Sequence, residues 1–132
     1  PSLLPMAAMR QDFQTAMVLV EKGAQPDRHI SQVLRPLLSG HLEWMAERLL
    51  KAGMPVELDD YAALSACIQN DAVDTAKLLL DRGMDLEQYR LWDAAYGRSD
   101  GHAETMDALS EYWSELQSGP QQDGPAMGGM SL

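Results

Sequence analysis

The side chains in this 132-residue sequence that could carry covalent or metal chemistry are one cysteine and three histidines. Cys67 with a histidine as its base would form a nucleophilic site, because the thiolate is the attacking species. However, Cys67 has the register of Ala7 and Leu37 in a 30-residue period, which favours a buried position in a helix. The histidines, none of which has the His-Glu-x-x-His spacing of a zinc site, are His29, His41 and His102. We therefore predict neither catalytic residues nor a metal site.

Two adjacent carboxylates, Asp59 and Asp60, are the next candidates for acid–base chemistry. Neighbouring side chains do not face each other across a substrate, and both residues directly precede the helical segment Tyr61-Ala62-Ala63-Leu64. We interpret them as N-caps of that helix. The sequence contains no glycine-rich phosphate loop, so neither a cofactor nor a small-molecule substrate is expected. The alternative is an enzyme in a helical frame that uses Cys67 or these acids.

A 30-residue period runs through most of the chain and is marked by Gly23, Gly53 and Gly83. The columns in phase with these glycines include Leu19, Leu49 and Leu79, then Ala16, Ala46 and Ala76, then Leu4, Leu34 and Leu64. Apolar residues recur at helical spacing, which predicts two short helices in each unit. The glycine follows the second helix, where a left-handed residue is needed, so we expect a positive φ at Gly53. One such unit cannot bury its apolar side, and stacked neighbours must share a core.

The most regular unit, residues 63–86, contains a leucine-bearing first helix, small residues, a turn, a leucine-rich second helix and a Gly-Met-Asp ending. Gly40-His41-Leu42-Glu43 and Met6-Ala7-Ala8 repeat parts of the same pattern. These motifs resemble the ankyrin-repeat family, well from Leu3 to Leu86 and weakly onward to Trp113. The family's Thr-Pro-Leu-His opening is missing, and the family's period is about 33 residues. The shorter period here implies short fingers, and the degenerate pattern favours a bacterial member.

The resemblance implies an all-α fold, a short ankyrin-type solenoid of about three to four helix-turn-helix units. We expect the repeat domain to span residues 1–117, with units at about 1–30, 31–60, 61–88 and 89–117. Residues 118–132 contain four glycines and two prolines, so we expect a flexible tail. A docking role for Met127, Met130 and Leu132 within that tail is the alternative.

Twenty acidic and ten basic residues give the chain a net charge of −10. Such a surface repels nucleic acids and anionic membranes, and it attracts a basic partner. No apolar run approaches the roughly 20 residues that a membrane-spanning helix needs. A single cysteine allows no intramolecular disulfide, which favours a reducing compartment, and we expect a cytoplasmic protein.

The resemblance implies a protein–protein interaction module, which could be an accessory, a scaffold, or an inhibitor- or immunity-like protein. In the family, partners usually contact the fingers and the exposed positions of the first helices. The residues that match these positions are Arg28, Glu57, Asp59, Asp60, Tyr61, Glu87, Tyr89, Arg90 and Trp92. Two further interpretations stay open, namely binding through the second-helix face around Trp44 and Glu47, and a fragment of a larger repeat protein.

Overall fold

A computed structural model describes residues 3–23, 30–96 and 101–123, and within these segments every regular element is an α-helix. The helices are α1 (Leu3–Met9), α2 (Phe13–Glu21), α3 (Ser31–Ser39), α4 (Glu43–Lys51), α5 (Tyr61–Gln69), α6 (Val73–Asp81), α7 (Leu86–Tyr96) and α8 (Ala103–Asp123). The expected all-α class is therefore confirmed for the described residues. Arg28 and the tail residues Met127, Met130 and Leu132 lie outside them.

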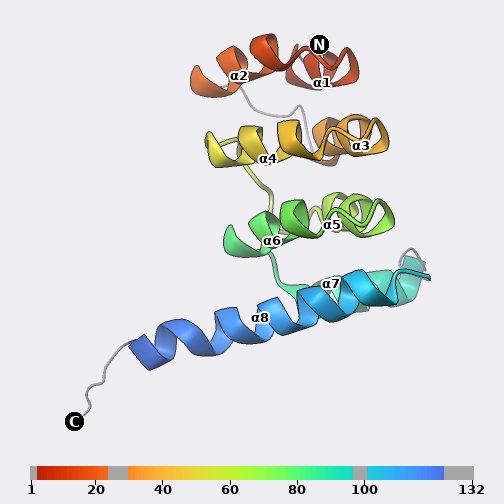
Figure 1. Cartoon of the computed structure of the whole chain (residues 1–132), viewed down its shortest axis with the longest axis vertical. Coiled ribbons are helices and arrows are strands. Elements are labelled where there is room, and N and C mark those ends of the chain that lie inside the picture. Colours follow the sequence, from red (N-terminus) through yellow and green to blue (C-terminus); the bar gives the residue numbers. More distant parts are fainter. Residues whose placement is uncertain (1–2, 24–29, 97–100, 124–132) are drawn as a thin grey trace.

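The helices follow one another as pairs that are stacked along one axis (Figure 1). α1, α3 and α5 pack in turn along one side of the stack, and α2, α4 and α6 pack along the other. The bounds of α3 and α5 differ by 30 residues, as do those of α4 and α6. Each of these four helices has nine residues, which is too short for stability in water, so burial against neighbouring helices must stabilise them.

A continuous apolar core runs between the helices of each pair and between successive pairs. The fully buried side chains include Leu34, Leu38, Leu49, Met54, Leu64, Ile68, Leu79 and Met84. Ala46 and Ala76, which are also fully buried, let neighbouring helices approach closely. Leucine, methionine and alanine therefore build this core with little aromatic contribution before α7.

Both helices of a pair end in the same kind of turn, with one left-handed residue just past the helix. Gly53 has a φ of 105°, which confirms the expectation from the sequence. The Gly53 N–H donates to the carbonyl of Leu50 at 3.1 Å. The Met54 N–H donates to the carbonyl of Leu49, also at 3.1 Å. The residues with positive φ that end the first helices are Gln11, His41 and Asp71.

Gly53→Ala is expected to lower the free energy of unfolding by about 1 kcal/mol. A methyl group at Gly53 would meet no atom within 4 Å, so the cost arises from the positive φ and not from a clash. Gly53→Asn is the matched control, because asparagine tolerates the left-handed conformation and should lose less stability. Urea denaturation measures the free energy of unfolding of both variants. If the two variants lose the same amount, the positive φ is not the cause of the loss.

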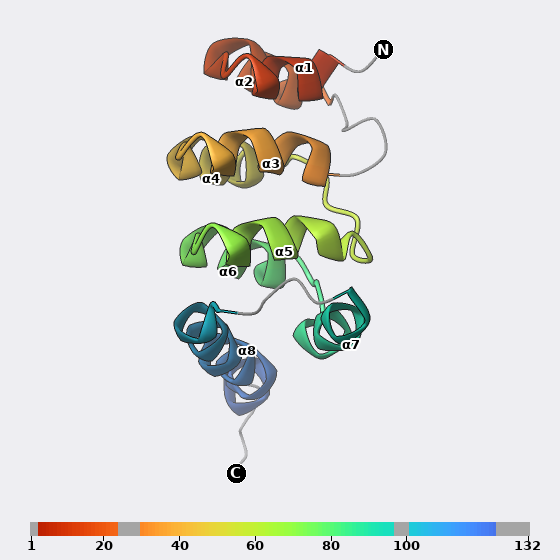
Figure 2. The ribbon, with the colours of Figure 1, turned by 90° about the vertical axis from the view of Figure 1, so that its right-hand side faces the viewer.

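The last helix pair departs from the 30-residue register. α7 begins at Leu86, inside the segment expected to form the third unit. The Asp85 carboxylate accepts hydrogen bonds from the N–H groups of Glu87 (2.8 Å) and Gln88 (3.1 Å), which caps the helix at this earlier point. Figure 2 shows α7 and α8 nearly end-on but α3 and α5 along their length, so the last pair is turned relative to the others.

α8 continues to Asp123, six residues past the boundary at 117 that we expected from composition. It packs on α6, and Leu109 is fully buried there. Adding residues to an existing helix costs far less than starting one, so a helix anchored by packing can extend beyond its packed face. Residues 118–123 are therefore helical, and the rest of the expected tail lies outside the described residues.

Two polar side chains join one helix pair to the pair before it. Asp60 is only 5% exposed, and its Oδ2 accepts a hydrogen bond from the Ser31 N–H at 2.9 Å. Asp60 occupies the N-cap position of α5, as expected, but its carboxylate makes no capping hydrogen bond there and caps α3 instead. The Arg82 guanidinium donates to the carbonyls of Leu50 (3.2 Å) and Met54 (2.8 Å), at the carboxyl end of α4.

Candidate functional site

A row of four aromatic side chains extends from α5 across α7. Tyr61 lies 6.4 Å from Trp92 and 6.5 Å from Tyr89, measured between ring centroids. Trp92 lies 5.8 Å from Tyr89 and 5.0 Å from Tyr96. We call Tyr61, Tyr89, Trp92 and Tyr96 the aromatic edge. Tyr89 is fully buried, Tyr61 and Trp92 are half-buried, and Tyr96 is 61% exposed, so the row runs from the core to the surface.

The structure separates the expected contact residues into accessible and buried ones. The exposed or partly exposed members are Glu57, Asp59, Tyr61, Glu87, Arg90 and Trp92. Tyr89 is 0% exposed and Asp60 is 5% exposed, so the expectation that these two side chains are available to a partner is wrong. Tyr89 is buried because α7 starts early enough to turn its ring inward. Asp60 is buried because its carboxylate caps α3.

Arg90 and Tyr96 change the set of residues expected to contact a partner. Arg90 is exposed, but its guanidinium hydrogen-bonds to the hydroxyl of Ser110 on α8, so it helps to hold α7 and α8 together. Tyr96 was not among the expected residues. Its spacing from Tyr89 and Trp92 places all three on one helix face, and this pattern would have indicated it once α7 was known to begin at Leu86.

The opposite face of the stack has a smaller aromatic cluster on α2 and α4. The rings of Phe13 and Trp44 are 4.9 Å apart, and the Arg48 guanidinium lies 5.4 Å from the Phe13 ring centroid. Trp44 is 50% exposed and Glu47 is half-buried. The competing second-helix face therefore also offers an aromatic side chain to a partner.

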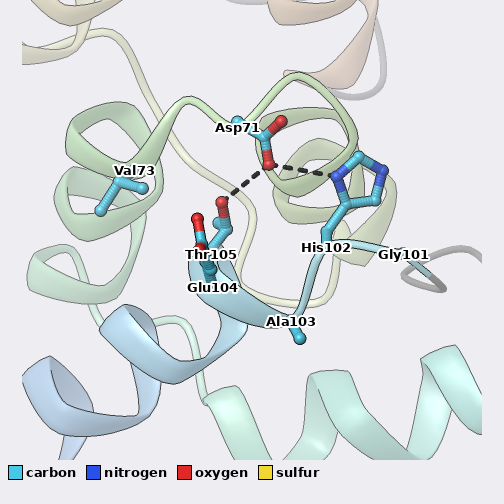
Figure 3. A pocket seen from close by; sticks show the side chains of 7 residues that line it. All are labelled: Asp71, Val73, Gly101, His102, Ala103, Glu104 and Thr105. Carbon is cyan, nitrogen blue, oxygen red and sulfur yellow. Dashed lines mark hydrogen bonds and ion pairs between the residues drawn. The ribbon is translucent and has the colours of Figure 1, made fainter.

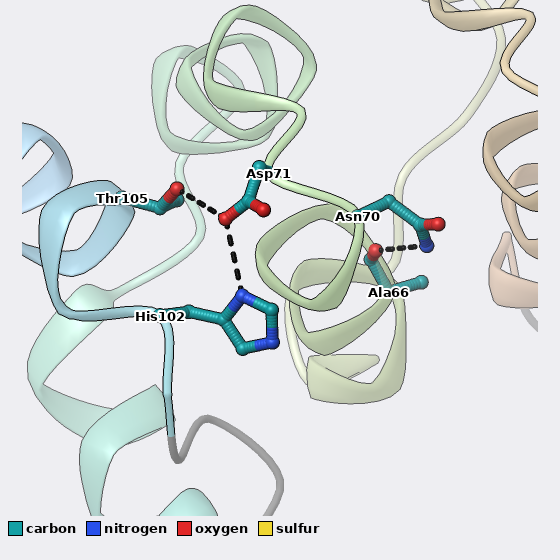
Figure 4. Close-up of polar contacts among 5 residues, drawn as sticks. All are labelled: Ala66, Asn70, Asp71, His102 and Thr105. Carbon is teal, nitrogen blue, oxygen red and sulfur yellow. Dashed lines mark hydrogen bonds and ion pairs between the residues drawn. The ribbon is translucent and has the colours of Figure 1, made fainter.

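A cavity of about 560 Å³ lies where the start of α8 meets the turn between α5 and α6 (Figure 3). Asp71 Oδ1 accepts a hydrogen bond from the Thr105 hydroxyl at 2.8 Å and lies 3.1 Å from Nδ1 of His102 (Figure 4). A carboxylate beside an imidazole is the arrangement that orients a general base. Here the Thr105 hydroxyl, which lines the cavity, already donates to Asp71. The cluster is therefore suited to fastening α8 to the stack.

The hydrogen bonds to Asp71 predict a stability change in acid. The Thr105 hydroxyl first, and His102 second, hold the pKa of the Asp71 carboxyl below its ordinary value. The folded carboxyl thus releases its proton at a lower pH than the unfolded one. Asp71 consequently stabilises the fold above the unfolded value of about 3.9, and the contribution is lost as the pH falls through the folded pKa.

Thermal melts of the wild type and of Asp71→Asn between neutral and strongly acidic pH test this. The wild type should melt at the higher temperature at neutral pH and lose that advantage below about pH 4. Thr105→Val removes the hydroxyl but keeps the shape of the side chain. Its melting temperature should lie below that of the wild type at neutral pH, and the difference should disappear over the same pH range. If the difference in melting temperature between the wild type and Asp71→Asn stays constant at every pH, the ionised Asp71 carboxylate is not the source of the stabilisation.

Cys67 is fully buried in α5, as its register predicts. Burial raises the pKa of the Cys67 thiol well above its ordinary range, because the thiolate would be desolvated. The thiol is consequently protonated and inaccessible in the folded protein at neutral pH. The enzymatic alternative therefore loses its candidate nucleophile.

Comparisons with protein-family models, with characterised proteins and with solved structures find no match for this chain. In the described part of the chain, no helix combines the length and apolar character that crossing a bilayer requires. The same residues contain no group of three or more His, Cys, Asp or Glu side chains placed to hold a metal ion.

Proposed function

We propose that the chain is a short ankyrin-type solenoid that binds another, basic protein in the cytoplasm, as an accessory, scaffold, or inhibitor- or immunity-like protein. The 30-residue register of the helix bounds and the left-handed turn residues support the family resemblance. A lone buried cysteine suits a reducing compartment. The aromatic edge and the acidic residues near it support the binding of a basic protein.

The aromatic edge is the main observation that supports a protein-binding function. Tyr96 is exposed and part of Trp92 and Tyr61 is accessible, while Tyr89 anchors the row in the core. Rings held in place in this way lose little conformational entropy on binding, which is a property of interface anchors. Exposed carboxylates lie close by in sequence, with Glu57 and Asp59 before Tyr61 on α5, and Glu87 in the first turn of α7.

This combination of ring faces and carboxylates favours a partner that presents arginine or lysine. Cation–π contacts and charge pairing would act on the same basic side chains. The net charge of −10 would also speed the approach of a basic protein, and added salt would reduce this effect. Nucleic acids and anionic membranes would be repelled by the same charge.

The test begins with capture of partners from the native host by the full chain, followed by mass spectrometry. Surface plasmon resonance of an identified partner then measures four variants. Tyr96→Ala and Trp92→Ala should speed dissociation, because they remove anchoring rings. Glu57→Lys and Glu87→Lys should mainly slow association and weaken its dependence on salt.

Trp44→Ala and Glu47→Lys are the matched controls on the second-helix face. Circular dichroism of each variant checks that the fold is retained, which matters most for the half-buried Trp92. If the aromatic-edge variants bind like the wild type while the Trp44 and Glu47 variants lose binding, the partner uses the opposite face. An acidic partner, with binding that strengthens as salt is added, would contradict the proposed chemistry.

A further inference from the structure

The first helices of the first three pairs carry almost no charge. α1, α3 and α5, which pack in turn along one side of the stack, contain no acidic residue and a single basic one, Arg35 on α3. The acids of these pairs lie on α2, α4 and α6 and in the turns. This row of helices therefore has one positive charge and no negative one, within a chain of net charge −10.

Arg35 lines a cavity of about 260 Å³ between α3 and α5. We call it the α3–α5 cavity, and its lining consists of Arg35, Ser39, Ala66, Gln69 and Asn70. The Arg35 side chain is exposed, and none of the residues that the structure describes forms a hydrogen bond or an ion pair with its guanidinium. The cavity thus contains a cation that no acid of the described chain neutralises.

The other polar side chains of the cavity add hydrogen-bond donors around this cation. Asn70 Nδ2 donates to the carbonyl of Ala66 at 2.8 Å, which holds the amide at the end of α5 (Figure 4). An amide nitrogen has two N–H groups, so a second one remains for a ligand. Ser39, the last residue of α3, supplies a hydroxyl. Donors gathered beside a guanidinium suit a ligand with anionic oxygen atoms.

The size and polarity of the cavity decide which anionic ligand fits. Sites for small molecules are mostly apolar and measure roughly 300–1,000 Å³. The α3–α5 cavity is smaller, and Ala66 is the one apolar residue of its lining, so it suits a single side chain better than a whole metabolite. A phosphate would bring up to two negative charges to one cation, whereas a carboxylate brings one and matches the planar guanidinium with its two oxygens.

We propose that the α3–α5 cavity binds the carboxylate of an aspartate or glutamate side chain of the partner protein. This inference rests on the proposed protein-binding function and adds a second contact to the aromatic edge. Tyr61 and Gln69 begin and end α5, about 12 Å apart along the helix axis, so one partner of ordinary interface size can reach both. Distant acids of the chain oppose the carboxylate little, because exposed charges are screened beyond about 8–10 Å.

An NMR titration of the full chain with acetate tests the site without any partner. At constant ionic strength, acetate should shift the side-chain N–H signals of Arg35 and Asn70 along a curve that saturates between about 1 and 100 mM. Arg35→Gln should abolish the saturating shift of Asn70. Arg35→Lys keeps the charge but not the planar fork, so a weaker response should remain. Lys51→Gln is the matched control, because it removes one exposed positive charge from α4, on the other side of the stack.

Three outcomes of this titration would overturn the proposal. One is the absence of a saturating shift in the wild type, and another is a response of Asn70 in Arg35→Gln that equals the wild-type response. The third is inorganic phosphate that saturates at a lower concentration than acetate, which would indicate a site for a free phosphate group.

Surface plasmon resonance with the captured partner separates this inference from the proposed function. Arg35→Gln should weaken binding about tenfold, because it removes a charge-assisted hydrogen bond, and Lys51→Gln should change it little. If Tyr96→Ala and Trp92→Ala weaken binding but Arg35→Gln does not, the protein-binding function stands and the carboxylate site is wrong. If all three variants bind like the wild type, both proposals are wrong.

Discussion

Tyr89→Ala is expected to lower the free energy of unfolding by about 3–5 kcal/mol, the range for deleting a large buried aromatic side chain. Tyr89 is 0% exposed and contacts the rings of Tyr61 and Trp92. Removing it leaves a cavity between α5 and α7, the helices that form the aromatic edge. Because a small helical domain is only marginally stable, a loss of this size would leave much of the protein unfolded.

Tyr96→Ala is the control for this substitution, since it truncates the same residue type on the same helix at a position that is 61% exposed. It should cost well under about 1 kcal/mol. Urea denaturation followed by circular dichroism measures both. A loss for Tyr96→Ala as large as that for Tyr89→Ala would show that burial does not set the cost. Tyr89→Phe keeps the ring and should preserve most of the stability, which separates packing from the contribution of the hydroxyl.

Asp60→Ala should lower the free energy of unfolding by about 1.5–3 kcal/mol, the range for a hydrogen bond that involves a charged group. Its carboxylate accepts the Ser31 N–H at 2.9 Å in a buried setting, so the variant leaves an amide at the start of α3 without that acceptor. Asp60→Asn keeps an oxygen acceptor and should lose less. The neighbouring Asp59→Ala is exposed and provides the comparison.

Chemical denaturation of the three aspartate variants gives the free energies, and hydrogen exchange at Ser31 reports on the cap itself. Exchange at this amide should quicken in Asp60→Ala and stay unchanged in Asp59→Ala. Equal destabilisation by the two alanine substitutions would mean that the buried hydrogen bond contributes little. Both aspartates would then act only through the charge that they bring to the turn.

The sequence predicted the features that depend on local chemistry. The left-handed glycines at Gly53 and Gly83 and the buried position of Cys67 follow from residue type and register. The all-α class likewise follows from helical spacing within each unit. These features need no knowledge of which distant residues meet, and this explains why a single sequence was sufficient for them.

The hydrogen bonds that sequence reasoning missed depend on distant partners. Asp60 stands where an ordinary N-cap would, yet its hydrogen-bond partner is 29 positions earlier in the chain. Asp71 and His102 are 31 residues apart, and nothing local to either indicates the other. Tyr89 was placed on the surface because the fourth unit was expected to keep the period, whereas Asp85 starts α7 early and turns the ring inward.

The bonds made by Asp60 and Arg82 make the α3–α4 pair depend on the pair that follows it. Each side chain completes the end of a helix in the preceding pair, Ser31 at the start of α3 in one case and the Leu50 and Met54 carbonyls after α4 in the other. During synthesis the earlier pair leaves the ribosome first, but its caps arrive only with its successor. The α3–α4 pair thus gains these hydrogen bonds only after α5 and α6 have been synthesised. Loss of α5 and α6, by proteolysis or local opening, would in turn remove the caps of α3 and α4 and favour the opening of that pair.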